Sequence, residues 1–342
     1  MWVRNAWYVA GWSEEFAAGT LHARTVIGEP LVLYRRADGA MVCLEDRCCH
    51  RFAPLSRGRL EGDELRCMYH GLKFAADGRC TEIPGQTSIP ERACVRTFPV
   101  VESGCWLWIW MGAAEQADPA TIPATITRDD PEWRLGTGTL DYAADYRLIN
   151  DNLLDLSHLS FAHEKTLGRG QPRWADERPK MTRLPRGLRF ERWNEDDPAA
   201  GFLSRFGERL DMWTSYDFLL PGIFVQRTAW HPAGAARAAG FGVPDGDPVF
   251  VRFDDHAVTP VGARSSRYFY AAGGSRAVMD EQSAARMLDF STRAFLEDKG
   301  IIEAQQVVID REPDRPMLAT SLDAGPTRFR RIVDEFLAAE AA

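Results

Sequence analysis

Residues 48 to 71, with the sequence CCHRFAPLSRGRLEGDELRCMYHG, bring together side chains that bind metals. One residue separates Cys48 from His50. Two residues separate Cys67 from His70, and sixteen residues lie between the two pairs. Each pair is close enough in sequence for one loop to direct a sulfur and an imidazole at a shared group. Three kinds of structure fit these residue types: two disulfides, a structural zinc site or an iron–sulfur cluster.

The cysteine count argues against disulfides. The chain has seven cysteines, an odd number, and all of them lie at or before Cys105 in a sequence of 342 residues. A secreted disulfide scaffold spreads an even number of cysteines along its length, whereas clustered cysteines beside histidines in a reducing compartment more often bind metal. The disulfide interpretation is therefore the weakest of the three.

The order of residues within each pair separates zinc from an iron–sulfur cluster. Structural zinc sites usually pair their ligands across two or more intervening residues, but one residue intervenes in the first pair here. Each pair also supplies one cysteine and one histidine. A Rieske [2Fe–2S] centre needs this combination, because two cysteines bind one of its irons and two histidines bind the other. The pattern favours a Rieske cluster, with structural zinc as the alternative, and its ligands would be Cys48, His50, Cys67 and His70.

A second group of polar residues lies in DYRLINDNLLDLSHLSFAHE, residues 145 to 164. On a regular helix Asp155 and His158 would project from nearly the same face, whereas His163 would lie about 140° away from His158. We therefore expect the helix to be interrupted here by a π-bulge or a break, as is common at functional sites. Histidines on apolar helices are often only hydrogen-bonded core groups. The other polar side chains among these leucines also need partners, which favours a site.

Two histidines and one carboxylate form the facial triad of mononuclear Fe(II) oxygenases, which leaves coordination positions open for oxygen and substrate. The carboxylate has to come from another part of the chain. A second helical segment, residues 280 to 309, offers four candidates: Asp289, Glu297, Asp298 and Glu303. Glu297 and Asp298 continue equally regular apolar rows of that helix, so periodicity does not choose between them.

The chain divides into two regions by pattern. Residues 1–112 read as short strands joined by turns, with a row of alternating tryptophans in CWLWIWMG that we assign to core packing. Residues 113–131 are rich in Ala, Asp, Pro and Thr and read as a linker. Residues 132–342 combine helical segments with strands of an antiparallel sheet. We expect an α+β fold, with an all-β N-terminal domain and a C-terminal domain whose helices pack on the sheet.

Helical spacing in the second region covers residues 141–163, 280–309 and 326–341. The strands between them are expected to line a substrate pocket. Four aromatic side chains are candidates for its apolar wall: Phe224, Phe253, Tyr268 and Phe269. Two arginines are candidates for contact with an anion: Arg227 and Arg252.

Composition and charge exclude several classes of partner. The formal net charge is −8 and no block of Lys and Arg stands alone, so we expect no nucleic-acid partner. The N-terminus, MWVRNAWYVAGW, lacks the basic start and continuous apolar core of a signal peptide. No apolar run approaches the length of about 20 residues that spans a bilayer. We expect a cytoplasmic protein without a membrane partner.

The motif formed by CCH, sixteen residues and CMYHG resembles the Rieske motif of aromatic-ring oxygenase terminal subunits. The flanking segments VRNAWYVAG, HRFAPLSRG and YHGLKF are similar to the vanillate O-demethylase and dicamba O-demethylase branch of these enzymes. The similarity runs from residue 2 to the C-terminus and is weakest between about 165 and 245. Cys49 departs from the motif, because relatives commonly have proline there, and we expect its side chain to pack against the loop.

The resemblance implies roles for further residues. In this branch the iron-binding carboxylate is the aspartate of an EDK-like step, which falls on Asp298 and completes a site with His158 and His163. The resemblance also implies that Asp155 links the two metal centres, contacting the second Rieske histidine, His70, of a neighbouring subunit. That contact implies a homotrimer. We expect the carboxylate of Asp155 also to accept a hydrogen bond from the free N–H of the His158 ring.

The resemblance further implies an enzyme, the terminal oxygenase of a multicomponent system. Electrons from NAD(P)H would arrive through a flavin and iron–sulfur reductase or a ferredoxin, and O2 would be activated beside a small aromatic substrate. In this branch a methoxy carbon is hydroxylated and formaldehyde is released, so we expect O-demethylation of a methoxylated aromatic acid such as vanillate. His256 resembles a position where relatives bind a substrate carboxylate. Ring dihydroxylation and aryl-ether cleavage are alternatives, and a non-catalytic Rieske electron carrier is the alternative of another class.

Overall fold

The computed structural model of the chain describes residues 1–163, 166, 178–199 and 201–341. It divides into two compact units. Unit 1 comprises Met1–Thr125 and Thr259–Ala263, and unit 2 comprises Ile126–Val258 and Arg264–Ala342. The division between Thr125 and Ile126 falls within the segment that its composition marks as a linker.

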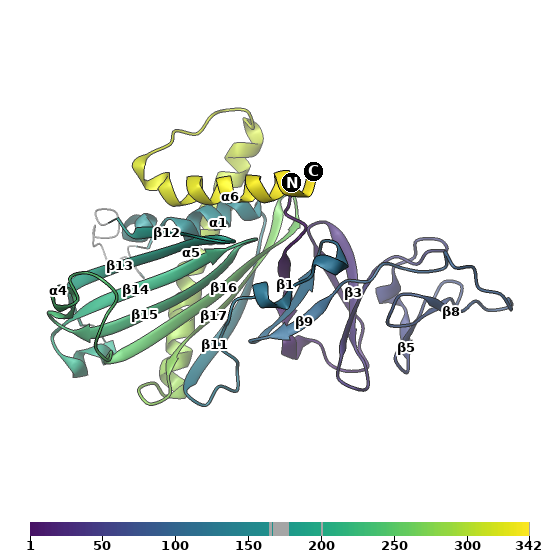
Figure 1. The fold of residues 1–342 in the computed structure, drawn as a ribbon, viewed down its shortest axis with the longest axis horizontal. Helices are drawn as coiled ribbons and strands as arrows, with labels where there is room; N and C mark the ends of the chain where they lie inside the picture. Colours follow the sequence, from purple (N-terminus) through teal and green to yellow (C-terminus); the bar gives the residue numbers. More distant parts are fainter. Residues whose placement is uncertain (164–165, 167–177, 200, 342) are drawn as a thin grey trace. The chain divides into compact units, whose positions relative to one another are not determined.

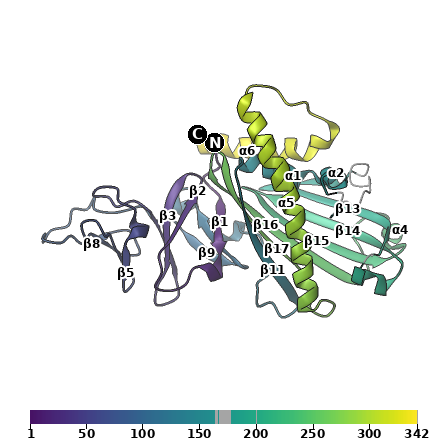
Figure 2. The ribbon, with the colours of Figure 1, turned by 180° about the vertical axis from the view of Figure 1, so that it is seen from behind.

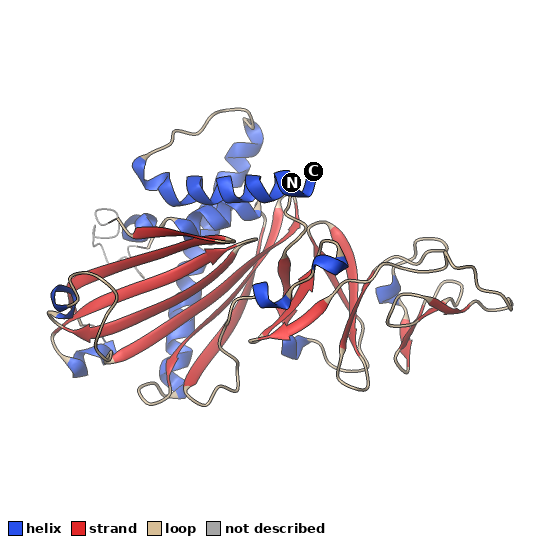
Figure 3. Cartoon of the chain, in the orientation of Figure 1, coloured by secondary structure: helices blue, strands red, loops and turns tan. Residues whose placement is uncertain are grey.

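Unit 1 is built from short antiparallel strands with 3₁₀ turns between them (Figure 3). Its strands are β1 (Trp7–Trp12), β2 (His22–Val26), β3 (Glu29–Arg35), β4 (Met41–Glu45), β5 (Arg59–Glu61), β6 (Glu64–Arg66), β7 (Lys73–Phe74), β8 (Cys80–Glu82), β9 (Val100–Ser103) and β10 (Trp106–Trp110). The 3₁₀ turns are η1 (Ser13–Glu15), η2 (Leu55–Arg57), η3 (Ala114–Gln116) and η4 (Pro119–Thr121). The strands form three sheets, in the orders β1-β10-β9, β2-β3-β4 and β5-β6-β7-β8. The expected all-β N-terminal region is confirmed.

The tryptophan row of β10 lies in the core of unit 1. Trp106, Trp108 and Trp110 are 1%, 0% and 3% exposed, and the two aliphatic residues between them are equally buried. β10 is the central strand of its sheet, paired with β1 on one side and β9 on the other. A strand covered on both faces buries every residue, so its alternation is between aromatic and aliphatic side chains rather than between buried and exposed ones. The assignment of this row to core packing is confirmed.

Two tight turns organise the hairpins of unit 1. Gly39 joins β3 to β4 with a φ of +88°, and Gly78 joins β7 to β8 with a φ of +80°. Both values lie in the left-handed region that side chains disfavour. At Gly78 a Cβ atom would also lie 2.2 Å from the carbonyl oxygen of Val95, so this turn has no room for a side chain.

Unit 2 contains one large antiparallel sheet covered by helices. Its strands are β11 (Trp133–Tyr142), β12 (Lys180–Leu184), β13 (Gly187–Pro198), β14 (Arg209–Leu219), β15 (Ile223–Pro232), β16 (Phe250–Gly262) and β17 (Ser265–Ser275). Their order in the seven-stranded sheet is β11-β17-β16-β15-β14-β13-β12 (Figure 1). The helices are α1 (Tyr146–Leu154), α2 (Leu159–Ala162), α4 (Ala235–Ala238), α5 (Glu281–Arg311) and α6 (Ala324–Ala341). The 3₁₀ turns are η5 (Leu156–His158), η6 (Gly201–Phe206) and η7 (Ser321–Asp323).

The long helix α5 crosses one face of this sheet against β11 and β17, as Figure 2 shows from behind, and α1 packs against both α5 and α6. α5 begins at the N-cap residue Asp280, whose carboxylate accepts a hydrogen bond of 2.7 Å from the backbone N–H of Ser283. Its buried row includes Ser291, Phe295 and Asp298. This arrangement confirms the expected α+β class.

Several elements differ from the sequence-based expectation. The first helix begins at Tyr146 rather than at residue 141, because residues 141 and 142 end the unexpected strand β11. The small-residue segment after β15 contains the short helix α4. Within the described part of the chain, no helix is long and apolar enough to cross a membrane.

Candidate active site

The helix that carries the two histidines is interrupted, as expected. α1 ends before Asp155, whose φ of −126° and ψ of 93° leave the helical region. The Asp155 carboxylate then caps η5 by accepting a hydrogen bond of 2.9 Å from the backbone N–H of Ser157. His158 ends η5 and His163 directly follows α2. The break therefore turns the chain just before His158, so that the two histidines no longer follow the spacing of one regular helix.

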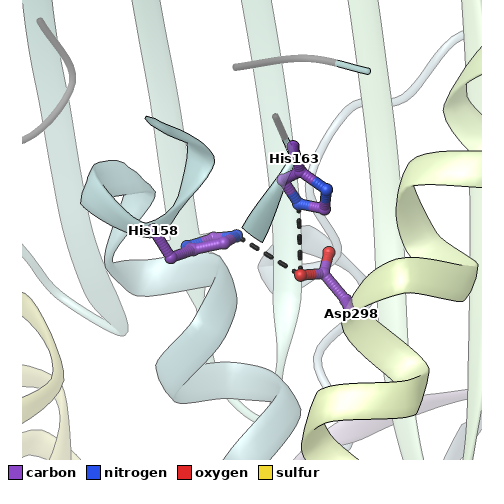
Figure 4. Close-up of side chains that lie close together, drawn as sticks. All are labelled: His158, His163 and Asp298. Carbon is purple, nitrogen blue, oxygen red and sulfur yellow. Dashed lines mark ion pairs between the residues drawn. The ribbon is translucent and has the colours of Figure 1, made fainter. Parts of the chain in front are cut away.

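His158, His163 and Asp298 converge (Figure 4). One ligand atom from each lies within 4.8 Å of the other two. Asp298 Oδ1 is 3.1 Å from His163 Nε2 and 3.5 Å from His158 Nε2. The histidines come from the broken segment after α1 and the aspartate comes from the buried row of α5. Among the described residues this is the one group of three or more histidine, cysteine or acidic side chains that comes together so closely.

The atoms of this trio fit a metal ion. His163 is fully buried, yet its Nε2 has no hydrogen-bond partner although Asp298 Oδ1 is only 3.1 Å away. Buried polar atoms without a partner are rare, and each calls for an explanation. An ion bound between the three side chains would satisfy Nε2. Two imidazoles and one carboxylate are the donor set of non-heme Fe(II) sites, and they leave positions open for other ligands.

The neighbouring carboxylate, Glu297, contacts the opposite side of the His163 ring. Glu297 Oε2 lies 2.8 Å from His163 Nδ1 and also accepts a hydrogen bond of 2.6 Å from the Thr166 hydroxyl. Burial lowers the pKa of His163, but Asp298 and Glu297 together outweigh it and raise that pKa above its ordinary value. Glu297 and Asp298 thus contact different nitrogens of His163, although the helical period does not distinguish them.

The two remaining acidic candidates on α5 have other partners. Asp289 is exposed and pairs with Arg293 at 3.0 Å. Glu303 accepts a hydrogen bond of 2.8 Å from the backbone N–H of Ala143 and pairs with Lys299. Neither belongs to the trio.

The structure also brings Asn152 to the trio. Its amide nitrogen donates a hydrogen bond of 3.0 Å to Asp298 Oδ1 and lies 3.2 Å from His158 Nε2. The sequence marks Asn152 only as one of several polar residues on an apolar helix. Its position beside two of the three converging atoms could not be inferred from that pattern.

The prediction that the Asp155 carboxylate accepts a hydrogen bond from the His158 ring is wrong, because another atom of Asp155 contacts the ring. His158 Nδ1 lies 2.5 Å from the main-chain carbonyl oxygen of Asp155. The Asp155 carboxylate instead caps η5. The break at Asp155 turns its carbonyl group toward the ring, and this contact still directs Nε2 of His158 toward Asp298.

The two loops that carry the cysteine–histidine pairs of unit 1 are closed in the same way. In the first loop the Cys48 N–H donates to the Ala53 carbonyl, and the Phe52 N–H donates back to the Cys48 carbonyl, both at 2.9 Å. In the second loop the Cys67 N–H donates to the Leu72 carbonyl at 2.8 Å, and the Gly71 N–H donates back at 3.1 Å.

The residue four places after each cysteine adopts a positive φ, 58° at Phe52 and 77° at Gly71. Positive φ is uncommon for a side chain as large as phenylalanine and marks backbone strain at a functional loop. At Gly58 a Cβ atom would lie 2.3 Å from the Arg66 carbonyl oxygen, so the residue before Cys67 packs directly against the end of the first loop.

The side chains in these loops separate into a pair of thiols and a pair of imidazoles. Cys48 and Cys67 are 1% and 2% exposed, and burial raises the pKa of the Cys48 thiol to about 12. The His50 and His70 rings are exposed, and their centroids lie 4.5 Å apart. Cys49 packs against the same core beside them, as expected.

This separation fits a two-iron cluster better than zinc. A tetrahedral zinc ion would hold all four ligand atoms within about 4 Å of one another. Among the described residues, the four side chains do not come together as one close group of possible metal ligands, as the trio in unit 2 does. A Rieske cluster instead needs two thiolates at one iron and two imidazoles at the other.

A cavity of about 360 Å³ in unit 2 includes the trio in its wall. α1, α5 and the residues after α1 form one side, and strands β14, β15 and β16 form the other. Its apolar wall includes Leu153, Leu159, Phe224, Trp230 and Phe295. Among the described residues Phe224 is the one member of the four expected aromatic side chains that lines this cavity.

His256 lines the same cavity and is 4% exposed. Its Nδ1 lies 2.7 Å from the Tyr268 hydroxyl and its ring stacks on Phe224, with ring centroids 5.0 Å apart. Its Nε2 has no hydrogen-bond partner. Burial, followed by the charge of Arg252, lowers the pKa of His256 to about 3, so the ring is neutral at ordinary pH.

Both regions of the chain match known sequence families. The Rieske [2Fe-2S] domain matches residues 6–99, and the vanillate O-demethylase oxygenase C-terminal domain matches residues 142–339. The iron–sulfur subunit of a toluene-4-sulfonate monooxygenase system from Comamonas testosteroni is 39% identical, over 99% of this chain and 98% of its own length. The chain belongs to the Rieske non-heme iron oxygenases.

Other members of this oxygenase family are similar along nearly their whole length. A vanillate O-demethylase oxygenase subunit from a Pseudomonas species is 33% identical over 93% of this chain and 97% of its own length. The crystal structure of dicamba monooxygenase bound to 3,6-dichlorosalicylic acid superposes with a TM-score of 0.87 at 29% identity. That superposition covers 100% of this chain and 99% of the other.

Family membership decides between the function classes left open by the sequence. This Rieske oxygenase is an oxidoreductase with a [2Fe–2S] cluster and a non-heme iron, and not only an electron carrier. Unit 1 contains the two cysteine–histidine loops that could hold the cluster, and unit 2 contains the trio that could hold the iron. Asn152 is an addition that only the structure supplies, since it has no sequence signal beyond its polarity on an apolar helix. The sequence offers Glu297 as a candidate iron ligand, and the structure instead places its carboxylate at Nδ1 of His163.

Proposed function

We propose that this oxygenase hydroxylates a methyl carbon of a small aromatic acid, and that its reaction is the O-demethylation of a methoxylated acid such as vanillate. The observation that carries the proposal is the cavity of about 360 Å³, which is lined by apolar side chains and, beside them, by His158, His163 and Asp298. A cavity of this size and polarity suits a substituted benzene ring, with a few polar groups to orient it. The relative named as a vanillate O-demethylase oxygenase subunit supports a methoxylated acid.

We assign the Fe(II) to His158, His163 and Asp298. The residues assigned to the Rieske cluster are Cys48, His50, Cys67 and His70. When bound, the two metal centres supply electron delivery and O2 activation. The polypeptide supplies the rest: the apolar wall excludes water from the reacting carbon, and the contacts of Glu297 and of the Asp155 carbonyl hold the two imidazoles in the orientation that points Nε2 into the site.

His256 is proposed to orient the substrate. Its Nε2 is buried in the cavity wall without a partner, and its Nδ1 is engaged by the Tyr268 hydroxyl. Because the ring is neutral, it forms a hydrogen bond with a substrate oxygen rather than a full ion pair.

Hydroxylation of a methoxy carbon accounts for loss of the methyl group. One oxygen atom of O2 is inserted into a C–H bond of the methoxy group, and the other is reduced to water with two electrons and two protons. The product is a hemiacetal, whose C–O bond breaks to give a phenol and formaldehyde. Formaldehyde therefore distinguishes this reaction from ring dihydroxylation.

The electrons are proposed to come from NAD(P)H through a separate flavin and iron–sulfur reductase or a ferredoxin. We further propose a homotrimer in which Asp155 links His158 to His70 of a neighbouring subunit. The exposure of the His70 ring is compatible with such a contact.

A second substrate class is favoured by the relative at 39% identity, which is named for a toluene-4-sulfonate monooxygenase system. An aryl sulfonate with a ring methyl group presents the same reacting carbon, but hydroxylation stops at a stable alcohol because no oxygen lies between that carbon and the ring.

Oxygen uptake and product analysis with a surrogate reductase test both candidates. The panel contains 4-methoxybenzoate, vanillate, 4-methylbenzenesulfonate and unsubstituted benzoate. We expect formaldehyde in amounts matching oxygen consumed for the methoxylated acids, and none from Asp298→Asn. A benzylic alcohol from the sulfonate without formaldehyde from any methoxylated acid would replace the first candidate with the second. Uptake without either product would contradict both.

A further inference from the structure

We propose that Arg252 anchors the anionic substituent of the substrate, a carboxylate or a sulfonate, at the end of the cavity away from the iron site. The anchor makes the enzyme select aromatic acids whose oxidised group is para or meta to the anionic group, as the methoxy group of vanillate is, and not ortho to it. The inference rests on the proposed function for the reaction, whereas the binding step it describes can be measured without turnover.

Strand register places Arg252 in the cavity wall. Thr214 of β14 lies opposite Thr228 of β15, and Thr228 lies opposite Arg252 of β16, so the three form one row across three strands. Side chains two residues apart on a strand share a face, and Arg252, Asp254 and His256 all line the cavity. Among the described residues, Arg252 is the one arginine or lysine in the wall.

The guanidinium of Arg252 is held in place but not saturated. Its Nη2 donates to Asp254 Oδ1 at 2.5 Å and to the Ser291 hydroxyl at 3.1 Å. Its Nε is buried and has no partner, although a guanidinium carries five N–H donors. The hydroxyl of Thr214, in a residue that is 1% exposed, also has no partner. A buried donor left unpaired costs free energy that a substrate oxygen would recover.

Asp254 orients the arginine without occupying all of its donors. Its side chain is 6% exposed, and burial raises its pKa while Arg252 lowers it. One edge of the planar guanidinium is fixed by Asp254 and Ser291. The donors that remain suit a planar or trigonal oxyanion, for which arginine gives a more directional site than lysine.

Position along α5 separates Arg252 from the iron site. Its partner Ser291 precedes Asp298 by seven residues, which is about 10 Å along a helix axis. His256 instead contacts Phe295, at a ring-centroid distance of 5.2 Å, only three residues before Asp298. A para- or meta-substituted ring can place its reacting carbon on the Asp298 side and its anion on the Arg252 side. An ortho-substituted ring is too short to do both.

The neighbouring strand β15 offers a matched control on the opposite face of the sheet. Arg227 donates to Asp255 Oδ1 at 2.7 Å, and Asp255 is also buried. The pair therefore has the same chemistry as Arg252 and Asp254. Arg227 and Asp255 do not line the cavity among its described residues.

Binding to the iron-loaded protein under anaerobic conditions tests the anchor, with isothermal titration calorimetry as the measurement. The ligands are 4-methoxybenzoate, 4-methoxybenzenesulfonate, the neutral 4-methoxybenzamide and the ortho isomer 2-methoxybenzoate. For the wild-type protein we expect the preferred para anion to bind at least about 10-fold more tightly than the amide and the ortho acid. Comparison of carboxylate with sulfonate identifies which oxyanion the site prefers.

Substitutions then test whether Arg252 causes the preference for anionic ligands. Arg252→Gln is expected to weaken anion binding by about 10-fold or more and amide binding by less than about 2-fold, with Arg252→Lys between it and the wild type. Because Arg252→Gln leaves Asp254 as an unpaired buried charge, the double variant Arg252→Gln/Asp254→Asn tests the same loss with the charge balance kept. Arg227→Gln should retain the wild-type preference.

Two results would overturn the anchor: equal binding of anion and amide by the wild type, or an anion preference that survives in the double variant. These outcomes are independent of the proposed reaction. If the anchor is present but no methoxylated acid yields formaldehyde, the O-demethylation proposal fails and the anchor stands. If formaldehyde is released while the double variant keeps its preference for anions, the reaction stands and the anchor fails.

Discussion

Glu297 and Asp298 are adjacent on α5, yet they contact opposite nitrogens of the same imidazole. Glu297 Oε2 lies 2.8 Å from Nδ1 of His163, and Asp298 Oδ1 lies 3.1 Å from Nε2. A hydrogen bond from Nδ1–H to Glu297 leaves the lone pair of Nε2 available to a metal. One carboxylate is thus suited to bind the ion, and the other to fix the ring that binds it.

The two carboxylates predict different losses of iron. Asp298→Asn removes a charged ligand atom, and we expect the mononuclear iron to be lost. Glu297→Gln keeps an acceptor for His163 but removes its charge, so iron affinity should fall by about 10- to 100-fold. Chelator competition followed by metal analysis measures both. Asp289→Asn, at an exposed position on the same helix, is the control and should bind iron normally. Complete loss of iron in Glu297→Gln with retention in Asp298→Asn would reverse the two roles.

The Rieske assignment predicts a selective loss in unit 1. Cys67→Ser should remove the [2Fe–2S] cluster, its brown colour and the rhombic EPR signal of the reduced protein, and lower the iron content from about three to about one per chain. Cys94→Ser is the matched control, because Cys94 is an exposed cysteine of the same unit. If the cluster signal persists in Cys67→Ser, or disappears in the control, the four-residue ligand set is wrong.

His256 predicts a pH dependence of stability. Its pKa falls from 6.5 to about 3 because of burial, so between these pH values the unfolded chain binds a proton that the folded chain does not. The stabilisation is complete above pH 6.5 and decreases as pH falls, by up to about 1.4 kcal/mol per pH unit. Replacement by glutamine, which cannot titrate, removes this dependence.

Urea denaturation of wild type and His256→Gln at pH 7.5, 6.0 and 5.0 measures the effect. The difference in the free energy of unfolding between the two proteins should shift in favour of the variant as pH decreases. A difference that stays constant across the three pH values would show that His256 is not held neutral by the fold.

The sequence predicts the ligands that are close together along the chain and fails where the site depends on long-range packing. Cys48 with His50, and Cys67 with His70, lie in short loops whose closure is local, so spacing alone suggests their chemistry. Asp298 and Glu297 differ by about 100° on a helix that packs against β11, β17 and α1. Which one faces His163 depends on where α5 meets the segment after α1, and periodicity carries no such information.

Strand register explains the errors in the predicted pocket wall. Phe253 and Arg252 are neighbours in sequence, but successive side chains on a strand point to opposite faces. On β16, Phe253 and Asp255 lie on one face, and Asp254 and His256 lie on the other. Each face carries one aromatic and one acidic side chain, so residue type does not identify the face that borders the cavity. The position of α1, α5 and the segment after α1 on one side of the sheet decides which face borders the cavity.

Asp155 gives the clearest test of communication between the metal centres. Its carboxylate caps η5 through Ser157, and its carbonyl, not its carboxylate, contacts His158. Asparagine caps helices about as well as aspartate, and a side-chain substitution leaves the carbonyl in place. Asp155→Asn should therefore retain both metals and the local fold while losing the negative charge.

We expect this loss to matter if the charge links His158 to a Rieske histidine of a neighbouring subunit. In the Asp155→Asn protein without substrate, the Rieske cluster should then be reduced at the normal rate. With substrate present, the variant should oxidise it at least about 10-fold more slowly. Stopped-flow reoxidation of the reduced cluster, followed by its visible absorbance, measures the transfer step directly. Asp145→Asn is the matched control, since Asp145 caps α1 through the N–H of Arg147 and has the same chemistry away from the trio. Normal reoxidation in Asp155→Asn would assign this residue to helix capping alone, because the cap is the one role that asparagine preserves.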